Sequence, residues 1–527
     1  DAVVDAASPV GAQVVHLRNW AEQQAANGAS GDRDLAPGHS PRAWTQISLS
    51  GRECVGASCQ YVGECFVQAA RAEAAASQLV VTNHAVVAFE AEHGWAVLDP
   101  DVLVVDEAHE LAARVTNCLT DELSPQMAER AARMAGSYLA DDTQDELRGV
   151  VERFTEALET ADPGLVRGGA ILTAAADLRN VLRRVMSAVG HDAGDTRREQ
   201  VANVVKEVFD IATRIAGGDE ADVIWVSARP QFGSQLVVAP LRVDTAIREA
   251  ILTHQPSILT SATLKLGDSF APIEAAIGLG GPEAEEAVPY TAADVGSPFD
   301  YRRQGICYVA SHLPPPGRDG TSDEALQEIA DLVDAAGGHT LGLFSSMRAA
   351  ERAADFVRYT TDKAVLLQGE GHLPDLIAQF LAEPALSLFG TISLWQGVDA
   401  PGETCHLVIV DRIPFPRPDE PLIQARQEDV SRRGGNGFMD VALRHAGLML
   451  AQGTGRLIRR TTDRGVVAIL DSRLLKARYG RFLLTSMPPL WMTTDRQVVL
   501  DALDRLGVVG TVGVDGPGPV REAPVVP

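Results

Sequence analysis

Residues Leu103–Glu110 read L-V-V-D-E-A-H-E, and this stretch decides the fold. The apolar run Val102–Val105 is typical of a short strand that is buried on both faces of a parallel sheet. Asp106, Glu107 and His109 follow at its carboxyl end, where open α/β sheets bind their ligands. An acidic pair there suits a site that hydrolyses a nucleoside triphosphate, because one carboxylate can hold Mg²⁺ while the next deprotonates the attacking water. A solvated acidic turn would also contain D-E, but the full D-E-A-H behind four apolar residues is much less common by chance.

The length of 527 residues is too great for one hydrophobic core and predicts several domains. The hydrophobic fraction of 46% is ordinary for a soluble globular protein, and no apolar run reaches the length of a membrane span. The net charge of −25 argues against a surface covered in nucleic-acid-binding charge, but it leaves room for a local basic channel. The chain begins with Asp1, without a Met or a signal sequence, so we expect its true start to lie upstream.

Three of the six cysteines lie close together, and Cys54, Cys59 and Cys65 have the spacing C-x4-C-x5-C. Zinc sites favour the tighter C-x2-C, whereas iron–sulfur clusters tolerate irregular spacing and need four thiolates in most proteins. The alternative to a metal site is that the three cysteines are buried as small hydrophobic side chains. Because the three occur within a dozen residues of a loop with Gly and Ser, a metal site is favoured. Six cysteines do not form a secreted disulfide framework, so a cytoplasmic location is expected.

Helical and strand periodicities alternate along the rest of the chain. In Leu79–Val87 an apolar strand is predicted that ends in Asn83 and His84, and a hairpin of two strands is predicted at Val223–Ser227 and Gln235–Ala239. From His339 the pattern is strand–helix, which predicts a parallel sheet. Between these parts an all-helical region is predicted, with helices at Pro125–Gly136, Thr143–Thr160, Ile171–Val189 and Thr196–Ile215 and loops at Ala140–Asp145 and Gly190–Asp195.

A basic motif, A-Q-G-T-G-R-L-I-R-R, occupies Ala451–Arg460 on a predicted helix. Arg456 and Arg459 lie three apart, so both are expected on one helical face. Two guanidinium groups presented to a phosphate cleft would neutralise charge that develops on the γ-phosphoryl group. The alternative is a solvated basic face; Gln452 and Gly455, in register with the arginines, favour the functional interpretation.

Taken together, these motifs resemble those of the DinG/XPD group of iron–sulfur superfamily 2 DNA helicases, from Cys54 to about Arg481. D-E-A-H resembles motif II, S-A-T in Ser257–Leu264 resembles motif III, and Q-x-x-G-R-x-x-R resembles motif VI. Thr391–Gly402 resembles motif V, with Gln396 where the family more often has Glu. In that motif Gly397 would let the backbone approach a ligand and Asp399 could reach the nucleotide. The family's cysteine cluster also precedes the DEAH strand.

The resemblance implies an α/β fold of two RecA-like motor domains with parallel sheets, the first interrupted by an iron–sulfur segment and a helical Arch insertion. The expected domains are an iron–sulfur segment at 1–78, RecA-like domain 1 at 79–111 and 222–277, the Arch at 112–221, RecA-like domain 2 at 278–507 and a tail at 508–527. The implied function is ATP-dependent translocation on single-stranded DNA, 5′ to 3′, with unwinding of branched or tailed duplex in repair, by a monomer with no membrane partner.

The resemblance also implies a role for each site residue. Asp106 would bind Mg²⁺, Glu107 would activate water, and His109 would couple this site to motif VI. A 4Fe-4S cluster would be held by the three cysteines, with its fourth ligand upstream of residue 1. No G-x-x-x-x-G-K-[ST] occurs among the 527 residues, so we expect the phosphate-binding loop upstream as well. The alternative is a scaffold that binds single strands without hydrolysing ATP.

Overall fold

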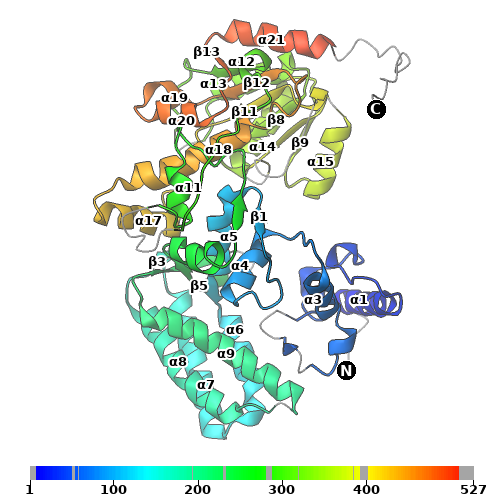
Figure 1. Cartoon of the computed structure of the whole chain (residues 1–527), viewed down its shortest axis with the longest axis vertical. Coiled ribbons are helices and arrows are strands. Elements are labelled where there is room, and N and C mark those ends of the chain that lie inside the picture. Colours follow the sequence, from blue (N-terminus) through cyan, green and yellow to red (C-terminus); the bar gives the residue numbers. More distant parts are fainter. Residues whose placement is uncertain are drawn as a thin grey trace. The chain divides into compact units, whose positions relative to one another are not determined.

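The computed structural model describes residues 8–49, 54–56, 59–192, 194–229, 233–280, 288–317, 320–383, 385–391, 394 and 402–509. The chain divides into two compact units (Figure 1). Unit 1 comprises Asp1–Thr260, Ala276–Val288 and Asp419–Ala425, and unit 2 comprises Ser261–Ala275, Pro289–Pro418 and Arg426–Pro527. Within the described ranges, no helix combines the length and the apolar character needed to cross a membrane.

Up to Thr260 the described residues are mainly helical, with six strands among them. Its elements are α1 (Pro9–Ala26), η1 (Arg33–Leu35), α2 (Pro41–Trp44), η3 (Val62–Glu64), α3 (Phe66–Ala76), α4 (His84–Glu92), β1 (Leu103–Val105), η4 (Ala108–Glu110), α5 (Leu111–Cys118), β2 (Asp121–Leu123), α6 (Pro125–Ala135), η5 (Gly136–Tyr138), α7 (Asp141–Glu159), β3 (Gly164–Leu165), α8 (Ala170–Val189), α9 (Thr196–Gly217), β4 (Asp222–Arg229), β5 (Gly233–Pro240), α10 (Asp244–Ile247), η6 (Arg248–Leu252) and β6 (Ser257–Leu259).

Strand β1, which leads into the DEAH sequence, pairs in parallel with β6, with Val104 opposite Ile258. Among the described residues these two strands form a sheet by themselves. The prediction that β1 is buried on both faces is wrong, because Val104 is 62% exposed while its neighbour Val105 is buried. The side chain of Val104 thus lies on a face of the sheet that the described residues leave uncovered, whereas Val105 lies on the covered face.

The predicted strand at Leu79–Val87 is also wrong. Asn83 instead begins helix α4, because its side-chain oxygen accepts a hydrogen bond from the backbone N–H of Val86 at 3.0 Å, as a helix N-cap does. Leu79 and Val81, which precede this cap, are 83% and 90% exposed. The apolar run is therefore an exposed approach to a helix.

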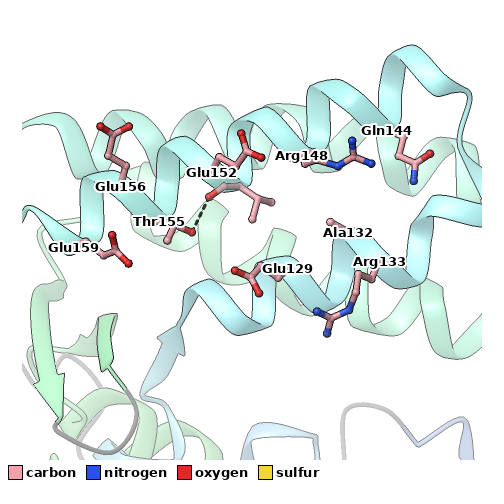
Figure 2. Close-up of a pocket in the computed structure, with 10 residues that line it drawn as sticks. Glu129, Ala132, Arg133, Gln144, Arg148, Glu152, Thr155, Glu156 and Glu159 are labelled. Carbon is pink, nitrogen blue, oxygen red and sulfur yellow. Dashed lines mark hydrogen bonds between the residues drawn. The ribbon is translucent and has the colours of Figure 1, made fainter.

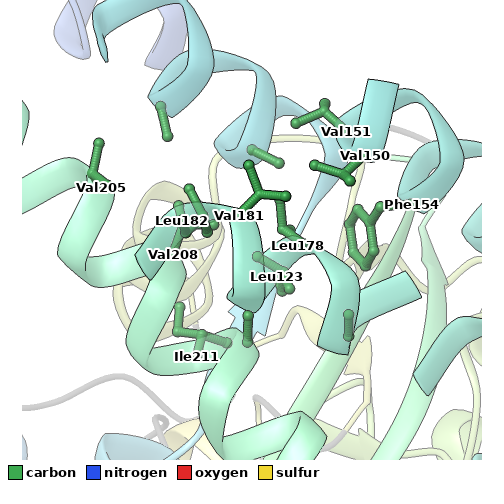
Figure 3. Close-up of a cluster of buried hydrophobic side chains, with 14 of the residues drawn as sticks. Leu123, Val150, Val151, Phe154, Leu178, Val181, Leu182, Val205, Val208 and Ile211 are labelled. Atoms are coloured by element: carbon green, nitrogen blue, oxygen red, sulfur yellow. The ribbon is translucent and has the colours of Figure 1, made fainter. Parts of the chain in front are cut away.

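Helices α6 to α9 pack around one apolar core (Figure 3). Their apolar residues recur with helical spacing, so Leu178, Val181, Leu182 and Val185 on α8 all face this core. The insertion predicted at 112–221 is mainly helical but not all-helical, because β2 and β3 lie within it and pair with β5 and β4 in an antiparallel sheet of order β2-β5-β4-β3. Its β4–β5 hairpin is the predicted one.

The predicted loop at Ala140–Asp145 is wrong as well, because α7 begins at Asp141. Asp141 and Asp142 occupy the first turn of this helix, where carboxylates interact favourably with the helix dipole. The acidic, loop-like composition of this stretch is therefore that of a helix N-terminus.

From Ser261 onward strands and helices alternate. The elements are α11 (Ala271–Ala276), α12 (Tyr301–Gln304), β7 (Gly305–Val309), α13 (Asp323–Ala335), β8 (Thr340–Leu343), α14 (Met347–Thr360), β9 (Val365–Leu367), α15 (Leu373–Ala382), β10 (Ser387–Gly390), η7 (Gly402–Thr404), β11 (Leu407–Val410), α17 (Pro421–Arg432), η8 (Phe438–Leu443), α18 (Arg444–Thr454), β12 (Gly465–Ile469), α19 (Arg473–Lys476), α20 (Gly480–Ser486), β13 (Trp491–Thr493) and α21 (Arg496–Val509).

Seven strands of unit 2 form one parallel sheet in the order β13-β7-β12-β11-β8-β10-β9. Both faces are covered by helices. In β11, Val408 and Val410 belong to a core shared with α15, α18 and α20, whereas Leu407 and Ile409 belong to a core shared with α13, α14 and α21. Such burial on both faces explains the near-continuous apolar strands. The predicted α/β fold with parallel sheets is confirmed.

Candidate nucleotide site

The D-E-A-H sequence forms a tight turn directly after β1. The N–H of Ala108 donates to the carbonyl oxygen of Thr260 at 3.0 Å, and the N–H of Thr260 donates to the carbonyl oxygen of Val105 at 2.9 Å. These bonds fix the turn to the chain that leaves β6. The predicted catalytic carboxylates therefore stand at the carboxyl ends of two parallel strands, where a ligand is expected.

Glu107 has a left-handed backbone, with φ 49° and ψ 43°. A residue with a Cβ adopts this conformation at a cost of about 1 kcal/mol or more, and such strain is concentrated at functional sites. Its N–H donates to Oδ1 of Asp106 at 2.9 Å, which helps to hold the strained turn. Both carboxylates are exposed, so a metal ion, water and phosphate can reach them.

His109 is buried beneath the turn, with only 7% of its side chain exposed. Its Nδ1 lies 3.3 Å from Oε2 of Glu107, and its Nε2 lies 4.0 Å from Oε1 of Glu110. Burial lowers the pKa of His109 below its ordinary value, although Glu107 and Glu110 act in the opposite direction. The imidazole is therefore mainly neutral at pH 7, and it positions the Glu107 carboxylate by contact.

His84 holds the same turn from another element. It is the first residue of α4, and its Nε2 lies 2.7 Å from the carbonyl oxygen of Asp106. Since a carbonyl only accepts, Nε2 carries the proton in this bond. Sequence reasoning gave His84 no chemical role; the signal was its place in T-N-H-A, directly after the cap Asn83.

The predicted helix across Ala451–Arg460 is wrong in its second half. Helix α18 ends at Thr454, and Gly455 is its C-cap. Gln452 therefore lies in the last helical turn, while Arg456 and Arg459 lie beyond it and cannot share a helical face. Gly455 keeps a right-handed backbone, with φ −65° and ψ −11°, so this helix end does not use the left-handed glycine turn that closes many helices.

A buried carboxylate orders the segment after α18. The N–H groups of Arg459 and Arg460 both donate to Oδ2 of Asp463, at 2.8 and 2.7 Å. Nε2 of Gln304 donates to the carbonyl oxygen of Arg460 at 2.9 Å. Asp463 and Gln304 are each 5% exposed. Sequence reasoning missed both residues, because only the folded chain brings Gln304 to this segment.

The structure says less about the remaining predicted site residues. Gly397 and Asp399 lie outside the described residues. The DEAH turn belongs to unit 1, and the segment of Gln452, Gly455, Arg456 and Arg459 belongs to unit 2.

Cys54, Cys59 and Cys65 are half-buried free thiols. Their donor chemistry suits an iron–sulfur cluster, but the part of the chain that the structure describes brings no three His, Cys, Asp or Glu side chains into a metal-binding group. The described residues therefore show the three thiols without an assembled metal-binding group, and the hydrolysis chemistry proposed below takes no step through a cluster.

A groove of about 470 Å³ lies between α6 and α7 (Figure 2). Its lining residues separate by charge, with glutamates toward one end and arginines toward the other. Thr155 donates its hydroxyl to the carbonyl oxygen of Val151 at 2.9 Å, so this group is already satisfied. The lining contains neither histidine nor cysteine. We interpret the groove as a solvated surface of the helical layer. None of its lining residues belongs to the DEAH turn.

Comparison with known proteins matches residues 329–490 to the model of a helicase C-terminal domain. The chain is 45% identical over 519 residues to the ATP-dependent helicase DinG of Mycobacterium tuberculosis, covering 95% of this chain and 77% of that protein. It is 31% identical over 514 residues to the ATP-dependent DNA helicase YoaA of Escherichia coli, covering 92% and 78%. A solved structure named XPD_APO matches with a TM-score of 0.48 at 17% identity, covering 74% of this chain and 76% of that one.

Proposed function

Because the chain belongs to the DinG/XPD family of helicases, we propose that it is an ATP-dependent DNA helicase that moves 5′ to 3′ along single-stranded DNA and unwinds branched or tailed duplex during repair and recombination. The observation that carries the proposal is the strained, exposed Asp106–Glu107 turn with His109 buried against it. In a protein that bound nucleic acid without hydrolysing ATP, the backbone strain at Glu107 would have no functional explanation.

In this proposal Asp106 would hold Mg²⁺, directly or through water, and the ion would supply positive charge to the nucleotide phosphates. Glu107 accepts a proton from the attacking water. His109, neutral and 3.3 Å away, fixes the orientation of the Glu107 carboxylate. His84 is a positioning residue, because it binds the Asp106 carbonyl and not the carboxylate.

The arginines of motif VI, in unit 2, are proposed to bind phosphate groups of the nucleotide. Arg456 and Arg459 stabilise the charge that builds up on the transferred group, an effect that planar guanidinium groups supply well. Gln452 and Gly455 shape the end of the helix from which the arginines follow. Gly397 and Asp399 line the nucleotide cleft in this proposal, on the strength of their motif alone.

The same proposal includes a 4Fe-4S cluster that Cys54, Cys59 and Cys65 would hold. It is supported by three half-buried thiols within one short segment. All six cysteines are free, which also supports a reducing, cytoplasmic compartment. Iron analysis of protein prepared without oxygen tests the cluster: zinc without iron would contradict it and leave the helicase proposal standing.

A second candidate is a scaffold that binds single-stranded nucleic acid without hydrolysing ATP. It is favoured by the sequence, in which no lysine follows a G-x-x-x-x-G loop. ATP hydrolysis measured with and without single-stranded DNA separates the two, and a helicase should be stimulated. Duplexes with a 5′ or a 3′ tail then test direction, because a 5′-to-3′ motor should unwind only the 5′-tailed substrate. DNA binding with no hydrolysis under any condition would favour the scaffold.

A further inference from the structure

Three aromatic rings from distant parts of unit 2 form one cluster. The ring of Phe438 lies 5.4 Å from that of Phe415 and 5.7 Å from that of Tyr479, and Phe415 and Tyr479 lie 5.6 Å apart edge-to-face. Phe415 and Tyr479 are half-buried, whereas Phe438 is 40% exposed. Phe415 and Tyr479 therefore pack against the ring of Phe438, and part of the Phe438 ring stays open to solvent.

The exposed ring is held by several features of the backbone. Phe438 begins η8, a stretch of π-helix, and such stretches frequently occur at functional sites. The preceding residue, Gly437, packs closely against α17: a Cβ there would lie 2.3 Å from the carbonyl oxygen of Gln427. The position of Phe438 is thus set by a close approach that requires glycine.

The cluster is anchored at the carboxyl edge of the parallel sheet, where α/β sheets bind ligands. The guanidinium of Arg473 lies 5.9 Å from the ring centre of Phe415. Arg473 also pairs with Asp471 at 2.7 Å. Asp471 is fully buried just past the end of β12, and it accepts a hydrogen bond from the N–H of Ile413, just past β11.

Tyr479 joins the cluster to a basic segment, Arg473–Arg481. This segment contains four basic residues and no acidic one, in a chain whose net charge is −25. Lys476, Arg478 and Arg481 are exposed. Within the described part of the chain, neither Arg478 nor Arg481 forms an ion pair. Positive charge that is not neutralised by neighbours is available for a phosphate group.

Proteins that bind single strands without sequence preference combine cationic grooves with aromatic side chains on which bases stack. We propose that Phe438 is a stacking platform for one base of single-stranded DNA, with Arg478 and Arg481 contacting the adjacent phosphates. The proposal rests on the proposed helicase function and assigns part of its DNA contact to these residues. It also explains how so acidic a chain binds DNA, since the attraction is local.

The test uses the whole chain, a fluorescein-labelled 20-mer of deoxythymidine and fluorescence anisotropy without nucleotide. Phe438→Ala should weaken binding roughly 5- to 150-fold, the range of a lost base stack. Its salt dependence should stay that of the parent, because no charge is removed. Arg478→Ala should instead reduce the slope of log affinity against log salt by about 0.7, the value of one phosphate contact to a single strand.

Two further variants decide between stacking and a structural effect. Tyr359→Ala removes an aromatic ring that is 89% exposed on α14 and should bind like the parent. Phe438→Trp should bind like the parent, and its additional tryptophan emission should fall when the oligonucleotide is added. This second readout remains informative even if Phe438→Ala fails to fold.

The outcomes separate the two proposals. Parent-like binding by Phe438→Ala, or emission of Phe438→Trp that does not change at saturation, would overturn the stacking site and leave the helicase proposal intact. If the parent chain does not bind the oligonucleotide at all, both the stacking site and the single-stranded DNA partner of the proposed function are wrong.

Discussion

Glu107 combines an unfavourable backbone with an exposed carboxylate, and the surroundings supply what holds it there. The hydrogen bond from its own N–H to Asp106 and the bond between Ala108 and Thr260 stabilise the turn. His109 limits the directions that the side chain can take. At the residue scale, then, the site consists of a strained turn that three neighbours hold in place.

Glu107→Gln keeps the size of the side chain and removes the base. When this substitution is made in a parent protein that hydrolyses ATP, we expect the rate of hydrolysis to fall by roughly 10²- to 10⁴-fold, the usual contribution of a general base. Binding of single-stranded DNA should not change. Glu156→Gln, an exposed Glu on α7, is the matched control and should hydrolyse ATP like the parent. Hydrolysis by Glu107→Gln at the parent rate would show that Glu107 is not the base.

A second residue-scale prediction concerns acid stability in unit 2. His406 is 7% exposed and stacks on His339 with 4.7 Å between the ring centres. Burial lowers the pKa of His406 to about 4. As the pH falls below about 6.5 the unfolded chain binds this proton first, so stability is lost progressively between about pH 6.5 and pH 4, by about 3 kcal/mol.

His406→Phe keeps a ring for stacking and removes the titration. Urea unfolding of the parent and the variant at pH 7 and pH 4.5 measures the difference. Buried Asp411, whose pKa is raised to about 6, acts in the opposite direction in both proteins and therefore cancels in the comparison. Equal acid sensitivity of parent and variant would refute the role of His406.

At the element scale, the end of α18 determines where the motif VI arginines lie. The helix stops at Thr454, and two N–H groups bound to Asp463 fix the segment that follows. Amphipathic spacing located α18 itself, as it located α8 and α9, because apolar stripes must face a core. Spacing did not reveal where α18 ends, since the path of the chain after Thr454 depends on Asp463, which becomes buried only in the folded chain.

The predicted burial of the DEAH strand on both faces was also wrong. The composition of Val102–Val105 predicts a strand covered on both faces, but coverage depends on which elements pack on the two faces of the sheet. In unit 2 the same kind of apolar run, Leu407–Val410, lies between β12 and β8 and is fully buried. The difference between the two strands comes from their neighbours and not from their own residues.

Asp463→Ala tests the element that presents the arginines. Two backbone N–H groups lose a charged acceptor, so we expect a loss of about 1–3 kcal/mol in stability. ATP turnover should fall as well, because Arg459 loses its fixed position. Asp463→Asn keeps an acceptor oxygen and should recover part of both properties. Parent-like turnover by Asp463→Ala would mean that the position of Arg459 does not depend on this carboxylate.

At the scale of the whole molecule, the chain consists of two units with separate cores. Every member of the two apolar cores that sandwich the seven-stranded sheet follows Pro298, and the described helices on both faces of the sheet do too. The DEAH turn, by contrast, lies in unit 1. Binding of a single strand to the aromatic cluster and hydrolysis at the DEAH turn therefore rely on different units.

A fragment from Pro289 to Val509 should consequently fold by itself, because it keeps every residue of both cores and the order of all seven strands. We expect a cooperative melting transition and resistance to limited proteolysis. The fragment should bind the deoxythymidine 20-mer in a way that depends on Phe438, and it should hydrolyse no ATP because Asp106 and Glu107 are absent. A fragment that folds but binds the oligonucleotide equally well with and without the Phe438 ring would place the DNA contact of unit 2 elsewhere. A fragment without cooperative melting would show that this sheet needs residues before Pro289 to fold.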